Sequence, residues 1–353
     1  MTPGPKAVAA LPGWEQAATA PIANALRSQC RGRWLTGAPD ESSRRMREAS
    51  CALLDQAPDE RAMRQAIARG FVAWPIVEDT GLGVGLMTGY HEPLVTGSRE
   101  RQSETQAPLY GPPARAASDA SPGPTRAEIA VDPRAAGVAG RELVWVDDPI
   151  EAFFLQIQGS GRIRLRDGSI MRVGFAAHNR HPYHAIGRTL IASGELTRES
   201  LSADAIKDWL RRNPNRAAAV MQTNPRVVFF RELPATHADA RAPGAQGPIG
   251  ALGVPLTARA SVAVDLDRLP AGALLYGRDL QAPPGAAGPG LLIAQDRGGA
   301  IRGAVRIDRF TGSDDAAARE ASALNAPVRM WLLWPRGARP PGGLPLAWTE
   351  PPL

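Results

Sequence analysis

The last third of this chain is made of short apolar segments that recur about every 10 to 15 residues, separated by glycine and proline. Evenly spaced short strands with such turns are typical of a barrel. Glycine (36 residues) and proline (33 residues) are frequent along the whole chain, which favours many turns over long helices. The pattern predicts barrel strands over residues 258–264, 273–277, 290–295, 300–308 and 328–334.

The first part of the chain has a different pattern. Residues 15–70 are rich in alanine and carry apolar residues three and four positions apart, which predicts helices. Strands are then expected over 71–77 and 84–90. With 353 residues the chain is long enough for two domains. We therefore expect a mainly β protein with N-terminal helices.

The middle of the chain mixes both patterns. A strand is expected over residues 142–146, followed by a short helix over 150–155 and by a hairpin that opens at residue 156. Further helices are expected over 182–193 and over 202–212, the second with Ser202 as its N-cap.

The charge of the chain limits its partners. The formal net charge is +6 and the pI is about 10.0, which suits nucleic acid, acidic lipid or an acidic polysaccharide. No dense block of Lys and Arg interleaved with aromatic residues marks a nucleic-acid site. No apolar run approaches the ~20 residues that span a bilayer. Residues 1–14 lack the basic and apolar regions of an export signal, so we expect either a mature, trimmed form or a cytosolic protein.

Two cysteines, Cys30 and Cys51, lie close together in the N-terminal segment. They are either two separate buried thiols or one disulfide formed in an oxidising compartment. A disulfide would close a loop of roughly 20 residues and contribute ~3 kcal/mol to stability. Two cysteines by themselves cannot form a structural zinc site.

The most informative stretch for function is Leu291–Asp308, with the sequence LLIAQDRGGAIRGAVRID. An apolar run leads to Asp296, which is followed by the glycine pair Gly298 and Gly299. Glycines let the backbone bend and let a ligand approach, so this pattern can place a carboxyl group at the edge of a cleft. The alternative is an ordinary polar hairpin turn.

Three other patterns could carry chemistry. The run His178, His181, His184 has metal-like spacing, but Pro182 begins a helix within it and no carboxylate or cysteine ligand is near, so a polar loop is favoured. The turn at Gly159, Ser160 and Gly161 lacks the frame of a nucleophile elbow, although a glycine-flanked serine beside Gln158 suits sugar hydroxyls. Tyr90 lies at a strand end, either in an ordinary turn or at a site.

Asp265, Asp296 and Asp308 are the carboxylates expected to matter, each at a predicted strand end or turn. Glycosidases with two carboxylates need an acid and a partner for water or covalent attack. One protonated acid suffices if the substrate carries its own nucleophile, because the acid donates a proton to the leaving oxygen and takes one back from the attacking group.

Seven segments occur in an order that closely resembles the membrane-bound lytic murein transglycosylase A family. The last third, from residue 260 to Asp308, looks like that family's 3D domain, which is named for three aspartates. The resemblance spans roughly residues 12–336. Its segments are GYHEP at 89–93, DDPIEAFF at 147–154, QIQGSG at 156–161, VGFAAHN at 173–179 with HPY at 181–183, IGR at 186–188, NPR at 224–226 with Phe229 and Phe230, and QDRGGAIRG at 295–303.

The resemblance implies a double-psi β-barrel domain, a second β domain inserted into it, and a groove between the two for a glycan strand. The barrel domain would comprise residues 1–97 and 245–353, and the inserted domain residues 98–244. The resemblance also implies a periplasmic location, with outer-membrane association as a further option. The implied partner is the peptidoglycan glycan strand, other cell-wall enzymes are further candidates, and no cofactor or metal is implied.

The implied activity is cleavage of the MurNAc–GlcNAc β-1,4 bond without water, in which the muramyl C6 hydroxyl attacks C1 and leaves a 1,6-anhydro end. By position, Asp296 matches the catalytic acid/base. Its pKa should be raised by burial or by a like charge, and Asp308 is a candidate for that neighbour or for structural support. The implied substrate-binding residues are Tyr90, Gln158, Gly159, Ser160, Asp265 and Asp308.

The chain departs from the family at several positions, including His91, Arg180 and Arg297. Arg297 follows Asp296 where a small residue or Thr is common, and a cation there would lower the pKa of the acid. We expect its side chain to point away, as alternation along a strand would place it. These departures leave two alternatives open: a peptidoglycan-binding protein of the same fold with impaired catalysis, and an ordinary hydrolase with two carboxylates.

Overall fold

The structure, a computed structural model, describes residues 5–32, 41–114, 121–234, 247–282, 290–338, 340 and 342–346. The chain forms two compact units, one of Met1–His91 with Gln246–Leu353 and one of Glu92–Ala245. We call them the barrel unit and the insert unit. No helix among the described residues has the length and apolar character needed to cross a bilayer.

The barrel unit is organised around β14, its longest strand, which pairs with β2, β11 and β3. The pairing with β3 closes a six-stranded barrel in the order β14-β11-β12-β10-β13-β3. β2 and β1 extend the sheet beyond β14. The strands are β1 (Lys6–Ala7), β2 (Phe71–Pro75), β3 (Gly85–Tyr90), β10 (Ser261–Ala263), β11 (Leu274–Asp279), β12 (Gly290–Asp296), β13 (Arg306–Phe310) and β14 (Asn325–Pro335).

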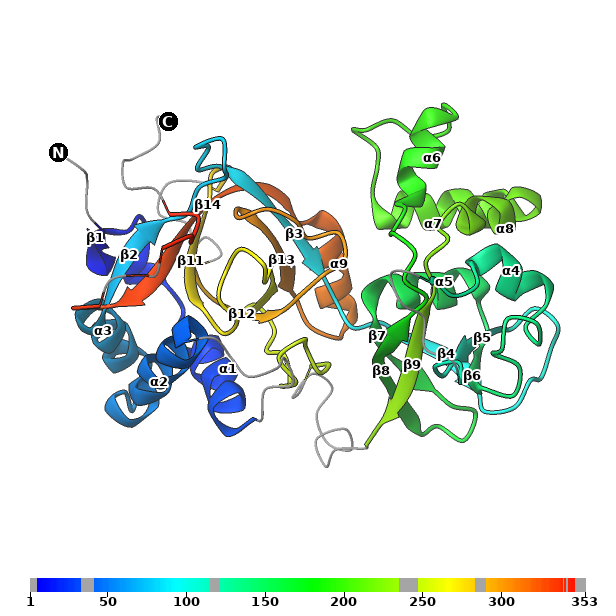
Figure 1. Cartoon of the computed structure of the whole chain (residues 1–353), viewed down its shortest axis with the longest axis horizontal. Coiled ribbons are helices and arrows are strands. Elements are labelled where there is room, and N and C mark those ends of the chain that lie inside the picture. The colour runs from blue at the N-terminus through cyan, green and yellow to red at the C-terminus, as the bar shows by residue number, and fades with distance from the viewer. Residues whose placement is uncertain are drawn as a thin grey trace. The chain divides into compact units, whose positions relative to one another are not determined.

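β12 is buried along almost its whole length, and its apolar run Leu291–Ala294 belongs to the main core. A strand covered on both faces is continuously apolar instead of alternating, which explains this segment. α1 (Ala20–Arg31) contacts β12, whereas α2 (Glu41–Gln56) packs on β14 and α3 (Glu60–Gly70) on β2. The three helices lie together beside the barrel in blue (Figure 1). Two short 3₁₀ helices, η1 (Val8–Ala10) and η2 (Trp14–Gln16), precede them, and α9 (Asp315–Ala323) packs on β3.

A disulfide and a pair of hydrogen bonds hold the N-terminal helix α1 in place. Cys30 on α1 and Cys51 on α2 form a disulfide with a Cα–Cα distance of 5.8 Å. Gln295 on β12 is fully buried, and its amide donates to the Ala25 carbonyl and to the Gln29 side chain of α1, at 3.0 and 3.2 Å. α1 is therefore tied both to its neighbour and to the strand that ends at Asp296.

The insert unit has a six-stranded sheet in the order β5-β6-β4-β7-β8-β9. Helix α5 packs with the sheet around one apolar cluster, and side chains of α5, α6, α7 and α8 form a second cluster. The strands are β4 (Leu94–Ser98), β5 (Ala107–Tyr110), β6 (Glu142–Val146), β7 (Ser160–Arg164), β8 (Ile170–His178) and β9 (Val228–Leu233). The helices are α4 (Arg126–Val131), α5 (Pro149–Gln158), α6 (Ile186–Ala192), α7 (Ala203–Arg212) and α8 (Pro214–Gln222).

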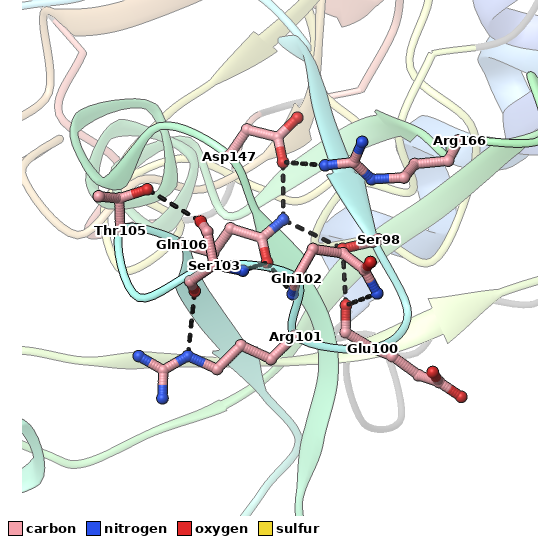
Figure 2. Close-up of polar contacts among 9 residues, drawn as sticks. All are labelled: Ser98, Glu100, Arg101, Gln102, Ser103, Thr105, Gln106, Asp147 and Arg166. Carbon is pink, nitrogen blue, oxygen red and sulfur yellow. Dashed lines mark hydrogen bonds and ion pairs between the residues drawn. The ribbon is translucent and has the colours of Figure 1, made fainter.

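A buried glutamine organises the loop between β4 and β5 (Figure 2). The Gln106 amide donates to the hydroxyl of Ser98 at 3.0 Å and to Oδ1 of Asp147 at 2.7 Å. Its carbonyl oxygen accepts from the backbone N–H groups of Gln102 and Ser103. Gln106 therefore connects the polar loop at 99–106 to Ser98 and Asp147.

The expected fold class, mainly β with N-terminal helices and a barrel, is confirmed. The expected start of the inserted domain, residue 98, falls at the end of β4. The structure places all of β4 in the insert unit, because β4 pairs with β6 and β7.

Three local predictions were wrong. β13 begins at Arg306, not at residue 300, because the Glu78 carboxylate accepts the N–H groups of Ala304 and Val305 just before the strand. α6 begins at Ile186, four residues after Pro182. α5 continues to Gln158, so the hairpin opens at Ser160 and not at residue 156. α8, which begins at Pro214, was not predicted. In contrast, Ser202 caps α7 as predicted, by accepting from the N–H of Ala205.

Candidate active site

Asp296 is the last residue of β12 and lies at an irregularity in the barrel. The pairing of β12 with β10 shifts between Val262 and Ala263, so that Ala294 pairs with Val262 and Asp296 pairs with Ala263. Gln295 is the extra residue, and its side chain is buried against α1. Such a shift re-aims the next side chain. The Gln295 side chain is held by α1, whereas the Asp296 carboxyl group finds its partners at Ala251 and Tyr90.

The two carboxyl oxygens of Asp296 have different partners. Oδ1 accepts from the backbone N–H groups of Ala251 and Arg297, both at 2.9 Å. Oδ2 accepts from the hydroxyl of Tyr90 at 2.7 Å. Burial raises the pKa of Asp296, and the hydrogen bonds from Tyr90, Arg297 and Ala251 counteract part of that rise. The net result is a carboxyl group that keeps its proton to higher pH than an ordinary aspartate.

Tyr90 reaches Asp296 from the end of β3. Its ring packs on Phe310 with a centroid distance of 5.4 Å, and its carbonyl accepts from both the backbone N–H and the hydroxyl of Thr311. Burial raises the pKa of Tyr90 well above its ordinary value, and the negative charges of Asp296 and Asp308 raise it further. The phenol therefore stays protonated and acts as a hydrogen-bond donor.

Asp308 lies on the other side of β10 from Asp296. Ala263 pairs with Asp296 on β12 and with Asp308 on β13, so the two aspartates are separated by two strand spacings, about 9.5 Å between backbones. Oδ1 of Asp308 accepts from the hydroxyl of Thr88 at 2.6 Å. Burial raises the pKa of Asp308, the Thr88 hydrogen bond and the Arg306 charge lower it, and the charge of Asp296 raises it.

Asp265 has a different position from the other two aspartates. It is 5 % exposed, and its carboxylate accepts from the N–H groups of Gly303 and Asp267 at 3.0 and 3.2 Å. These contacts tie the loop before β13 to the loop after β10. Arg297 is exposed, and among the contacts of the described residues only its backbone N–H reaches Asp296. The Arg297 guanidinium is not among the groups that shift the pKa of Asp296.

The remaining predicted residues lie in the insert unit. Gln158 is the last residue of α5, Gly159 caps that helix with φ 77°, and Ser160 begins β7. The positive φ explains the glycine, because other residues pay for that conformation with strain. Within the described ranges, no hydrogen-bond partner is found for the Gln158 amide or the Ser160 hydroxyl.

The three histidines have separate partners. His178 accepts from the N–H of Arg180, His181 lies 2.8 Å from the Gly123 carbonyl, and His184 lies 3.0 Å from the Thr189 hydroxyl. Among the residues that the structure describes, no group of three or more His, Cys, Asp or Glu side chains could hold a metal ion.

Three residues around the aspartates were not predicted from the sequence: Thr88 and Ala251 contact an aspartate directly, and Arg306 reaches Asp308 through Thr88. Thr88 precedes Tyr90 by two positions on a predicted strand, so alternation placed its side chain on the face of Tyr90 and could have identified it. Arg306 likewise precedes Asp308 by two positions. Ala251 acts through its backbone N–H, for which the sequence holds no signal.

Known proteins resemble the chain over most of its length. Membrane-bound lytic murein transglycosylase A of Escherichia coli K12 is 32% identical over 286 residues, which are 78% of this chain and 72% of that protein. The chain belongs to this family. Two family models match within it: the MltA specific insert domain at residues 86–231 and the 3D domain at residues 260–334.

Solved structures agree with the family assignment. A lytic transglycosylase of Burkholderia pseudomallei, LtgG, is 39% identical, with a TM-score of 0.61 and 96% of each chain covered. The membrane-bound lytic murein transglycosylase of Agrobacterium tumefaciens has a TM-score of 0.80 at 25% identity and covers 94% of this chain and 97% of its own. E. coli MltA with bound chitohexaose has a TM-score of 0.69 at 28% identity and covers 90% and 91%.

Proposed function

We propose that this chain is a lytic transglycosylase that cleaves the MurNAc–GlcNAc β-1,4 bond of peptidoglycan without water, with Asp296 as the sole general acid/base. The observation that carries the proposal is the environment of Asp296, where burial raises the pKa and each carboxyl oxygen has its own donors. Membership of the family and the chitohexaose bound to the E. coli relative support a glycan as substrate.

The hydrogen bonds of Asp296 determine where its proton sits. Oδ1 already accepts two backbone N–H groups, which fill its lone pairs. The acidic proton must therefore reside on Oδ2, the oxygen that faces the Tyr90 hydroxyl. A carboxyl group kept neutral by burial is suited to general acid catalysis near neutral pH.

The reaction then balances with one carboxyl group. Oδ2 of Asp296 donates its proton to the glycosidic oxygen, and the bond between that oxygen and C1 of MurNAc breaks. The C6 hydroxyl of the same MurNAc attacks C1 and forms the 1,6-anhydro ring. Its proton passes to the Asp296 carboxylate, which regenerates the acid. No water is consumed, so a second carboxylate to activate water is not required.

The same proposal gives roles to the other predicted residues. Tyr90 would orient Asp296 through its hydroxyl, in addition to lining the site. Gln158 and Ser160 would bind sugar hydroxyls with their available polar groups, and Gly159 would give the turn its shape. Family membership supports a location in the cell envelope, and the Cys30–Cys51 disulfide supports an oxidising compartment such as the periplasm.

The test is digestion of purified sacculi followed by mass analysis of the muropeptides. The wild type is expected to release anhydro ends, which are lighter than reducing ends by one water. Asp296→Asn keeps the size and acceptor oxygen of the side chain but cannot donate the acid proton, so we expect its rate to fall about 10²- to 10⁴-fold. Asp267→Asn, at an exposed position in the same unit, is the matched control.

The other outcomes would decide against the proposal. Reducing ends from the wild type would show an ordinary hydrolase. No products, with retained binding to sacculi, would show a peptidoglycan-binding protein of the same fold. Undiminished cleavage by Asp296→Asn would remove Asp296 from its role.

A further inference from the structure

A hydrogen-bond chain connects a cation to Asp308. The Arg306 guanidinium donates through Nη2 to the hydroxyl oxygen of Thr88 at 2.9 Å, and that hydroxyl donates to Oδ1 of Asp308 at 2.6 Å. A hydroxyl has one proton, so accepting from Arg306 directs the Thr88 proton toward Asp308. The two hydrogen bonds therefore run in one direction, from the Arg306 cation through the Thr88 hydroxyl to the Asp308 carboxylate.

The barrel strands place these three residues together. Thr88 on β3 pairs with Asp308 on β13, and Arg306 precedes Asp308 by two positions, so the three side chains share one face. The partly buried Arg306 has no direct ion pair among the described residues, and burial lowers its pKa. Asp308 is the carboxylate whose charge counteracts this. Burial raises the pKa of Asp308 overall, whereas the Thr88 hydrogen bond and the Arg306 charge oppose that rise and so favour the ionised form.

We propose that Thr88 is a positioning residue that couples the Arg306 guanidinium to the Asp308 carboxylate, and so favours the negatively charged form of Asp308 in the site of the acid Asp296. This role deepens the proposed function and rests on it. The two carboxyl groups would then have opposite tasks. Asp296 holds the transferable proton, and Asp308 stabilises the positive charge that develops at C1 when the glycosidic bond breaks.

Among the described residues, the groups that act on Asp308 are Thr88 and Tyr90 on β3, Arg306 on its own strand and Asp296 on β12. A negative charge on Asp308 favours the protonated form of Asp296, since like charges oppose each other. Loss of the Thr88 hydroxyl removes a donor that lowers the pKa of Asp308. Asp308 would then become neutral at a higher pH, and its support for protonated Asp296 would weaken.

The test compares Thr88→Val, which lacks the hydroxyl at nearly the same volume, with Thr88→Ser, which keeps it. Aspartate labelled with ¹³C at Cγ reports each carboxyl titration by NMR, and Asp308→Asn identifies the resonance of Asp308. We expect Thr88→Val to raise the pKa of Asp308 by about one unit and Thr88→Ser to leave it near the wild-type value. Arg306→Met should also raise it, which gives a second variant if Thr88→Val does not fold.

Activity provides an independent readout. In Thr88→Val the alkaline limb of kcat/KM for glycan cleavage should move to lower pH, and Thr88→Ser should keep the wild-type profile. In the Asp308→Asn background, Thr88→Val should have no further effect on that limb, because the residue it acts through is absent.

Two results would overturn the proposal: an Asp308 pKa that Thr88→Val and Arg306→Met leave unchanged, or one that they lower. Failure of the proposed function is a separate result. If the wild type forms no anhydro ends but Thr88→Val raises the pKa of Asp308, the coupling stands and the reaction is wrong. If anhydro ends form normally and the pKa does not change, the reaction stands and the coupling is wrong.

Discussion

The hydroxyl of Tyr90 lies 2.7 Å from Oδ2 of Asp296, although the two residues are separated by 206 positions in the chain. β3 and β12 are brought to one end of the barrel by their pairings through β13 and β10. The contact changes the expected role of Tyr90. A residue expected to line a substrate groove is a direct hydrogen-bond partner of the proposed acid.

Tyr90→Phe should keep the packing on Phe310 and remove only the donor to Asp296. This donor lowers the pKa of Asp296, so its loss should raise that pKa and move the alkaline limb of kcat/KM to higher pH. We expect kcat to fall about 10- to 100-fold, because a hydrogen bond to a charged group contributes about 1.5–3 kcal/mol. Tyr276→Phe is the control, because it also removes a buried hydroxyl of the barrel unit, one that donates to the Pro12 carbonyl. It should change neither the alkaline limb of kcat/KM nor kcat.

Asp296→Asn should stabilise the protein at neutral pH. A carboxyl group whose pKa is raised by folding binds its proton more tightly in the folded state, so stability falls as pH rises from the unfolded pKa, about 3.9, to the folded pKa. Asparagine does not titrate, so the variant does not lose stability in this way over this pH range. The Tm of the variant minus that of the wild type should therefore increase through this pH window and then stay constant. A difference that is flat or decreasing with pH would contradict the raised pKa, and Asp267→Asn controls for loss of an exposed carboxylate.

Arg297→Thr should leave the pH dependence of cleavage unchanged. The Arg297 side chain is exposed, and its contact with Asp296 is made by the backbone N–H, which threonine retains. The charge of an exposed guanidinium is screened by solvent and salt. The pH profile of kcat/KM should match that of the wild type within error. A shift of the alkaline limb to higher pH in the variant would show that the Arg297 cation lowers the pKa of the acid.

Reduction of the Cys30–Cys51 disulfide should lower stability by about 3 kcal/mol, since the bridge closes a loop with a sequence separation of 21. For a unit of this size that corresponds to a fall in Tm of roughly 6–12 °C. The measurement is thermal unfolding with and without dithiothreitol. The double variant Cys30→Ser, Cys51→Ser should show the lower Tm in both conditions. An identical Tm for wild type with and without reductant would contradict a stabilising bridge.

Local chemistry made parts of the fold predictable. The apolar run Leu291–Ala294 became β12 because a strand buried on both faces has a continuous apolar signal. Ser202 was identified as an N-cap because its hydroxyl can accept an N–H of the first helical turn. Residues 142–146 form β6 with the bounds expected from their composition.

Long-range contacts account for what the sequence did not reveal. The strand expected over 300–308 starts only at Arg306, because Glu78, far away in the chain, binds the N–H groups before it. The one-residue shift that re-aims Asp296 depends on burial of Gln295 against α1, which no local pattern indicates. Thr88 lies close to Asp308 because β3 pairs with β13, although the two strands are far apart in the sequence.

Digestion of sacculi in water enriched in ¹⁸O tests the central claim most directly. If the C6 hydroxyl of MurNAc attacks C1 in place of water, with Asp296 as the acid/base, the new muropeptide ends are 1,6-anhydro and carry no ¹⁸O, and Asp296→Asn forms them far more slowly. Reducing ends that carry one ¹⁸O atom would show attack by water and would contradict the account.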